Sequence, residues 1–350
     1  GDDTDNSLTG TDDNSALFGA GGDDVLRGGG GDDVLVSGAG VQDFTTDGET
    51  LQGGAGDDLL IGGTFSAVRL QGGAGNDQLV AQNVSYSNDE TRWFEWVVFD
   101  YSEDPGNITV NLTNGTFAGI NASSVRDGYG NIDTVTGVRT IYDSASGDQL
   151  RIDGTLENSH SNNRVEVDLS SGGNDTVDFP GAGGGRISFV NATEGVSASL
   201  NFGTANDRDQ SDGNSIGVNT FTGALELKGS DFDDLLDGNL FDNSFQGRGG
   251  NDTIMGGSGQ DSADYWSARQ FVTVALESTT DQASDDGYGG TDQLISIEDI
   301  NGGLTHDRIA GDGGSNVLNG YTGNDGLIGR GGNDTLIGDE GGAAGFKGGN

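Results

Sequence analysis

The chain has 350 residues, with 57 acidic and 15 basic side chains and a formal net charge of −42 at pH 7. This charge argues against nucleic acid as a partner, because phosphate binding needs basic patches. The absence of cysteine excludes disulfides, cysteine-bound zinc and a thiol nucleophile. The sequence also holds no run of 18 apolar residues of the kind that spans a membrane.

Residues 1–80 carry a nine-residue repeat, Gly-Gly-x-Gly-x-Asp-x-Leu-x, whose strict copies begin at Gly28, Gly53 and Gly72. One large apolar residue per nine is too sparse for a helical stripe, which needs one every three or four residues. We therefore predict that each nonapeptide forms a tight glycine turn and one short strand, so that the apolar residues stack in a column. Looser copies of the repeat return in residues 229–264 and 302–350.

Spacer segments between these blocks are richer in strand-forming and aromatic residues. Each contains an alternating stretch that predicts a strand, namely residues 108–112, 196–200 and 272–276. Each spacer ends on an acid and an apolar residue in the spacing of the repeat, so we interpret the spacers as longer turns of the same solenoid, with a globular insert as the alternative. The predicted organisation is a first repeat block (1–80), a first spacer with its closing coil (81–155), a degenerate coil and second spacer (156–228), a second block (229–264), a third spacer (265–301) and a third block (302–350).

The sixth residue of the nonapeptide is an acid in most copies, and stacking would place these carboxylates in rows. Like charges in a row repel unless a cation lies between them, and carboxylates with turn carbonyls are hard oxygen ligands that suit Ca²⁺. Halophile-type surface charge and disorder are the alternative explanations of the acidity. The predicted calcium ligands are Asp24, Asp33, Asp58, Asp77, Asp148, Asp175, Asp234, Asp252, Asp261, Asp307, Asp325 and Asp334. The uncharged Asn6, Asn243 and Asn316 at this position predict weaker or absent sites.

The nonapeptide resembles the repeat of the RTX (hemolysin-type calcium-binding) family. The resemblance implies an all-β fold, a right-handed parallel β-roll or β-helix solenoid, in which turn carbonyls and aspartates of successive coils hold several calcium ions. It also implies export through a type I system. We therefore expect the chain to be a region of a larger bacterial protein that is secreted or displayed on the cell surface.

The motifs of catalysis are weak in this chain, and we expect no enzyme activity. Residues 213–217 match G-x-S-x-G, but no helix is predicted after them, as a nucleophile elbow requires. His160 and His306 lie outside any H-E-x-x-H motif. Paired acids such as Asp57 and Asp58 recur at every turn, whereas a catalytic pair is needed once.

The expected function is therefore architectural: a calcium-loaded solenoid of an adhesin, a surface layer or a filament. Its expected partners are calcium ions, further copies of itself, and other surface proteins or glycans. One alternative is the non-catalytic calcium-binding region of a secreted protease, lipase or polysaccharide epimerase. Another is a carbohydrate-binding module that uses spacer aromatics such as Tyr101, Tyr129, Tyr265 and Tyr288, although these residues are equally suited to fill a core.

Overall fold

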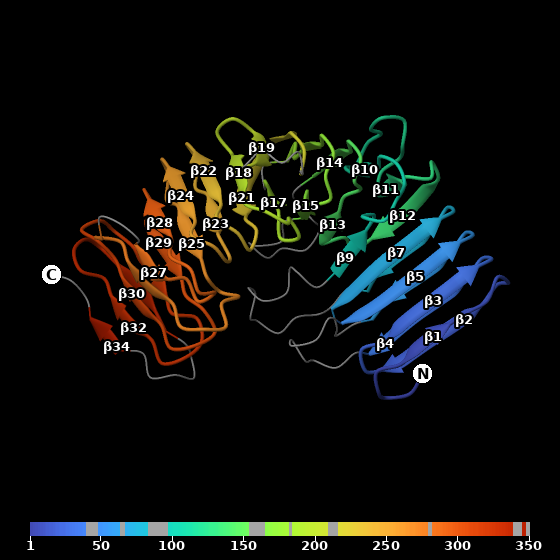
Figure 1. The fold of residues 1–350 in the computed structure, drawn as a ribbon, viewed down its shortest axis with the longest axis horizontal. Coiled ribbons are helices and arrows are strands. Elements are labelled where there is room, and N and C mark those ends of the chain that lie inside the picture. Colours follow the sequence, from blue (N-terminus) through green and yellow to red (C-terminus); the bar gives the residue numbers. More distant parts are fainter. Residues whose placement is uncertain are drawn as a thin grey trace. The chain divides into compact units, whose positions relative to one another are not determined.

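The computed structural model shows a chain of short strands and turns, with no helix among the described residues. The structure describes residues 1–39, 48–63, 67–82, 97–153, 165–181, 184–208, 216–278, 282–338 and 345–347. They form two compact units, Gly1–Gly185 and Arg186–Asn350, and each unit is described by itself. Figure 1 labels the strands along both units.

Unit 1 is built from two sheets whose strands alternate along the repeat blocks. The first sheet contains, in order of pairing, β1 (Ser7–Thr9), β3 (Val25–Gly30), β5 (Glu49–Ala55), β7 (Val68–Ala74), β9 (Val97–Asp100), β13 (Thr140–Tyr142) and β15 (Glu166–Asp168). The second contains β2 (Ala16–Gly21), β4 (Val34–Ala39), β6 (Leu59–Gly62), β8 (Gln78–Ala81), β12 (Ile132–Thr136), β11 (Ser124–Arg126), β10 (Thr109–Leu112), β14 (Gln149–Ile152) and β16 (Thr176–Asp178). Two consecutive nonapeptides therefore make one coil, with one strand in each sheet.

The apolar residues of the repeat form two columns instead of the single predicted one. In the first sheet, Leu26 pairs in parallel register with Leu8 on one side and Leu51 on the other. In the second sheet, Leu35 pairs in the same way with Leu17 and Leu60. The columns are separate because neighbouring nonapeptides go to opposite sheets. Leu26, Leu35, Leu51 and Leu60 are all 0% exposed, and burial of each leucine contributes about 1.5–3 kcal/mol to stability.

Unit 2 contains three sheets of the same kind of short strand. The first holds β17 (Gly185–Ser188), β21 (Ala224–Lys228), β23 (Ser244–Gln246), β25 (Ser262–Asp264), β29 (Asp299–Asn301), β31 (Val317–Asn319) and β33 (Thr335–Ile337). The second holds β20 (Asn219–Thr222), β19 (Thr204–Asp207), β18 (Val196–Ser199), β22 (Leu235–Asn239), β24 (Thr253–Gly257) and β28 (Gln293–Ile295). The third is five-stranded, with β27 (Ala283–Asp285), β26 (Thr273–Ala275), β30 (Arg308–Ala310), β32 (Gly326–Ile328) and β34 (Gly345–Lys347).

The three strands predicted in the spacers are confirmed as β10, β18 and β26. Each pairs in parallel with the next coil strand, β14, β22 or β30, and antiparallel with a strand of its own spacer, β11, β19 or β27. The spacers thus insert antiparallel strand pairs into otherwise parallel sheets. The predicted fold class, an all-β parallel β-roll with spacer segments, is confirmed.

Candidate metal centres

The sixth-position aspartates link each coil to the next through their Oδ1 atoms. Asp58 Oδ1 accepts the backbone N–H of Asp33 at 2.7 Å, and Asp77 Oδ1 accepts that of Asp58 at 2.8 Å. In unit 2, Asp252 Oδ1 accepts the N–H of Asp234 at 2.8 Å. Because acceptor and donor belong to equivalent turns of adjacent coils, the carboxylates form a row along the turns.

The second carboxylate oxygen of several of these aspartates is buried without a hydrogen-bond partner. This holds for Oδ2 of Asp24, Asp33, Asp58, Asp77, Asp252 and Asp261, whose residues are at most 2% exposed. A buried charged oxygen without a partner costs more than about 1–3 kcal/mol, so native proteins rarely leave one unsatisfied. A bound cation is the group that such an oxygen fits, since it both neutralises the charge and takes the lone pair.

The first glycine of the nonapeptide is required by this carboxylate. A Cβ on Gly28 would lie 2.2 Å from Asp33 Oδ2, and a Cβ on Gly53 would lie 2.3 Å from Asp58 Oδ2. Neither glycine has a positive φ angle, so the requirement at this position is space and not backbone freedom. The glycine at position one and the aspartate at position six are therefore one structural unit, in which the missing side chain makes room for Oδ2.

The pKa values of the sixth-position carboxyls show how unfavourable their charge is without a cation. Burial, and to a lesser degree the charges of Asp77 and Asp33, raise the pKa of Asp58 from 3.8 to about 7. Burial likewise raises the pKa of Asp252 to about 9, together with Asp292 and Asp234. A divalent ion reverses this balance, because it stabilises the ionised carboxylates that it binds. The donor set therefore fits Ca²⁺ in chemistry and in burial.

The row of acids continues through the spacers, which the sequence analysis missed. Asp133 Oδ1 accepts the N–H of Asp77 at 3.0 Å, and Asp292 Oδ1 accepts the N–H of Asp252 at 3.1 Å. Both acids are fully buried, and burial raises the pKa of Asp133 to about 8 and that of Asp292 to about 7. Each stands two residues before a buried apolar residue, as in the repeat, and this spacing is the sequence signal that could have identified both acids.

The structure places all twelve predicted ligands on turns of the coils. Eleven of them are buried, and Asp334 is half-buried. Asp148 and Asp175 come together, since the N–H of Asp148 donates to Asp175 Oδ1 at 2.8 Å. Asp307 and Asp325 are joined in the same way at 2.9 Å. Their role as calcium ligands stays a prediction.

Two asparagines at the sixth position donate hydrogen bonds from their side-chain amides to backbone oxygens of the protein. Asn316 Nδ2 donates to the backbone oxygen of Glu298 at 2.8 Å, and Asn243 Nδ2 donates to that of Leu225 at 3.4 Å. Each acceptor lies 18 residues earlier, on the preceding coil of the same sheet. An amide nitrogen thus lies where a cation would lie beside a carboxylate, and the weaker or absent sites at these positions stay a prediction.

The remaining candidates are the spacer tyrosines, the two histidines and the G-x-S-x-G match. Tyr101 and Tyr265 are buried, whereas Tyr129 is 51% exposed. His306 is exposed and its Nδ1 accepts the N–H of Asn324 at 2.8 Å. His160 and most of the G-x-S-x-G match, residues 213–215, lie outside the described residues. Among the residues that the structure describes, no helix is long and apolar enough to cross a membrane.

Comparison with known families identifies the repeat. The family model of the RTX calcium-binding nonapeptide repeat matches in four copies, over residues 1–40, 45–64, 67–83, 228–263 and 301–336. These ranges follow the three repeat blocks and leave out most of the spacers. No curated protein matches the chain. The glycine–aspartate unit, the stacked coils and the family match agree: over these ranges the chain carries RTX calcium-binding nonapeptide repeats.

Proposed function

We propose that the chain is a structural solenoid of a secreted or cell-surface protein, which folds when its turns take up extracellular Ca²⁺. The observation that carries this proposal is the row of buried, unpartnered Oδ2 atoms on the sixth-position aspartates. Without an ion, these atoms oppose folding of the coils that carry them. With ions, the same atoms join neighbouring coils.

Linkage between metal binding and folding explains how such a glycine-rich chain would become rigid. Free Ca²⁺ at 100 times the dissociation constant of a site stabilises the folded state by about 2.7 kcal/mol per site. Several sites of this strength offset part of the conformational entropy lost by the 67 glycines. Each coil contacts its neighbours, so folding propagates from coil to coil once one coil has formed. Export through a type I system would then deliver an unfolded chain into a calcium-rich medium.

A calcium titration followed by far-UV circular dichroism tests this function. We expect little β-structure in EDTA, a cooperative gain of β-structure as Ca²⁺ is added, and no comparable gain with Mg²⁺, which demands stricter octahedral geometry. A chain that is equally rich in β-structure in EDTA and in Ca²⁺ would contradict the proposal.

The architectural role as adhesin, surface layer or filament is supported by exposed apolar side chains in unit 2. Phe202, Leu240 and Phe241 are 76%, 76% and 68% exposed. Phe202 and Leu240 each stand three residues beyond the paired residues Ser199 and Asp237 of β18 and β22. The three side chains therefore follow neighbouring strands and suit contact with a further copy of the chain. Sedimentation velocity in Ca²⁺ should show association that weakens in Phe241→Ser, and a monomer at all concentrations would refute self-association.

A further inference from the structure

Asp143 breaks the rule that the first residue of the coil is glycine. Residues 143–151 form a nonapeptide, in which Asp148 has the sixth position and Leu150 the apolar position. The coil lies between β13 and β14, directly after the first spacer. The repeat predicts a ligand role for Asp148 and none for Asp143, because its first position is normally glycine.

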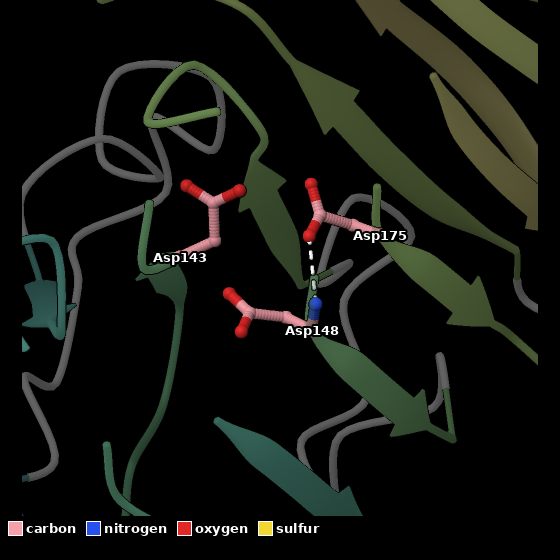
Figure 2. A group of neighbouring side chains, drawn as sticks. All are labelled: Asp143, Asp148 and Asp175. Carbon is pink, nitrogen blue, oxygen red and sulfur yellow. Dashed lines mark hydrogen bonds between the residues drawn. The ribbon is translucent and has the colours of Figure 1, made fainter. Parts of the chain in front are cut away.

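The structure brings three carboxylates together at this coil. One oxygen each of Asp143, Asp148 and Asp175 lies within 4.8 Å of the others. Figure 2 shows the three neighbouring side chains, with the hydrogen bond from the N–H of Asp148 to Asp175 as a dashed line. Calcium–oxygen distances of 2.3–2.6 Å allow two ligand atoms of one ion to lie up to about 5 Å apart, so the three oxygens can reach a common ion.

Asp143 has an oxygen that the protein itself does not satisfy. The residue is 0% exposed, and its Oδ2 has no hydrogen-bond partner. Its Oδ1 accepts only a long hydrogen bond, from the N–H of Ser171 at 3.3 Å. The oxygens of Asp148, by contrast, accept from Ile108 and Ser144 at 2.7 and 2.8 Å.

The charges around Asp143 are of the same sign as its own. After burial itself, the groups that most raise its pKa are the carboxylates of Asp175, Asp168 and Asp148. Burial also raises the pKa of Asp175 to about 8 and that of Asp148 to about 6. A divalent cation is the ligand that suits three buried carboxylates with these neighbours.

We propose that Asp143, Asp148 and Asp175 hold one Ca²⁺ in a three-carboxylate site, which fills before the sites of the regular coils. The inference rests on the proposed function and adds one point to it, the identity of the site that binds calcium first. The number of charged ligands is one of the factors that set calcium affinity, and the regular coils have glycine where this coil has Asp143. The coil after the first spacer would then be the point from which unit 1 starts to fold.

Calcium titration against a chromophoric chelator tests this site in the full chain. In the wild type we expect one ion to bind about tenfold or more tightly than the rest. Asp143→Asn should remove this tight class and leave the weaker classes and the calcium-induced β-structure in place. The matched control is Glu103→Gln, which removes a charge from an exposed side chain of the same unit and should retain the tight class.

Asp143→Gly is the second variant, because it restores the usual first residue of the repeat. It should fold in Ca²⁺ like a regular coil and also lack the tight class, which separates a loss of affinity from a loss of folding. A tight class that survives in both variants overturns the site, as does a wild type with a single class of affinity. Absence of any calcium-dependent folding in the wild type would instead refute the proposed function.

Discussion

The substitution Asp58→Asn should change stability in opposite directions with and without calcium. Asp58 Oδ1 accepts the N–H of Asp33, and an asparagine oxygen can keep that bond. The substitution therefore acts mainly on Oδ2, the buried atom without a partner. An amide nitrogen at this place can donate to a backbone carbonyl, as Asn316 Nδ2 does to Glu298.

The magnitudes follow from these contacts. In EDTA, the variant exchanges an unsatisfied buried oxygen for a satisfied amide, which should stabilise the fold by about 1–3 kcal/mol. In Ca²⁺ at 100 times the dissociation constant, losing one ion should destabilise it by about 2.7 kcal/mol. The change of sign is the signature of a cation site, because a merely structural carboxylate would affect both states alike.

Urea unfolding in saturating Ca²⁺ measures the expected loss of stability. Folding by trimethylamine N-oxide in EDTA measures the expected gain, since this osmolyte favours the folded state without acting as a ligand. The matched control is Asp57→Asn, which removes the same charge from the preceding, exposed side chain. Equal destabilisation of Asp58→Asn in both media, or an equal effect of Asp57→Asn, would refute the reasoning.

Three further predictions concern the same row of acids. Gly53→Ala should weaken calcium binding measured by equilibrium dialysis, because its Cβ would displace Asp58 Oδ2, whereas Gly115→Ala, with open space around its Cβ, should not; equal affinities would contradict the glycine–aspartate unit. Asn243→Asp should add bound calcium in the same assay and lower stability in EDTA, and an unchanged stoichiometry would count against a site there. The metal-free chain should gain β-structure as the pH falls. Asp252 has a pKa of about 9 in the folded state, above its unfolded value near 3.8. Protonation of Asp252 therefore contributes its full stabilisation of the folded state below pH 3.8, and this stabilisation is lost as the pH rises through 9. Circular dichroism in EDTA between pH 9 and 4 checks this, and a loss of β-structure on acidification would contradict it.

The spacing of the repeat predicted short stacked strands and the position of the acids, and its resemblance to a known family added the fold class. One apolar residue in nine, such as Leu26 or Leu51, permits a stacked strand and excludes a helix. The acid two residues before it, such as Asp24, must then lie on the turn. These conclusions depend on local geometry, in which every coil repeats the same short-range contacts.

Tertiary structure decided the features that depend on which coils become neighbours. The sequence shows leucines nine apart, but only strand pairing places Leu26 beside Leu8 and Leu51, because alternate nonapeptides go to opposite sheets. Asp133 joins the acid row across 56 residues from Asp77, a distance set by the spacer. Asp143 likewise reaches Asp175 only because adjacent coils pair in register. Contacts between distant segments depend on this register, which the residues of a single repeat do not encode.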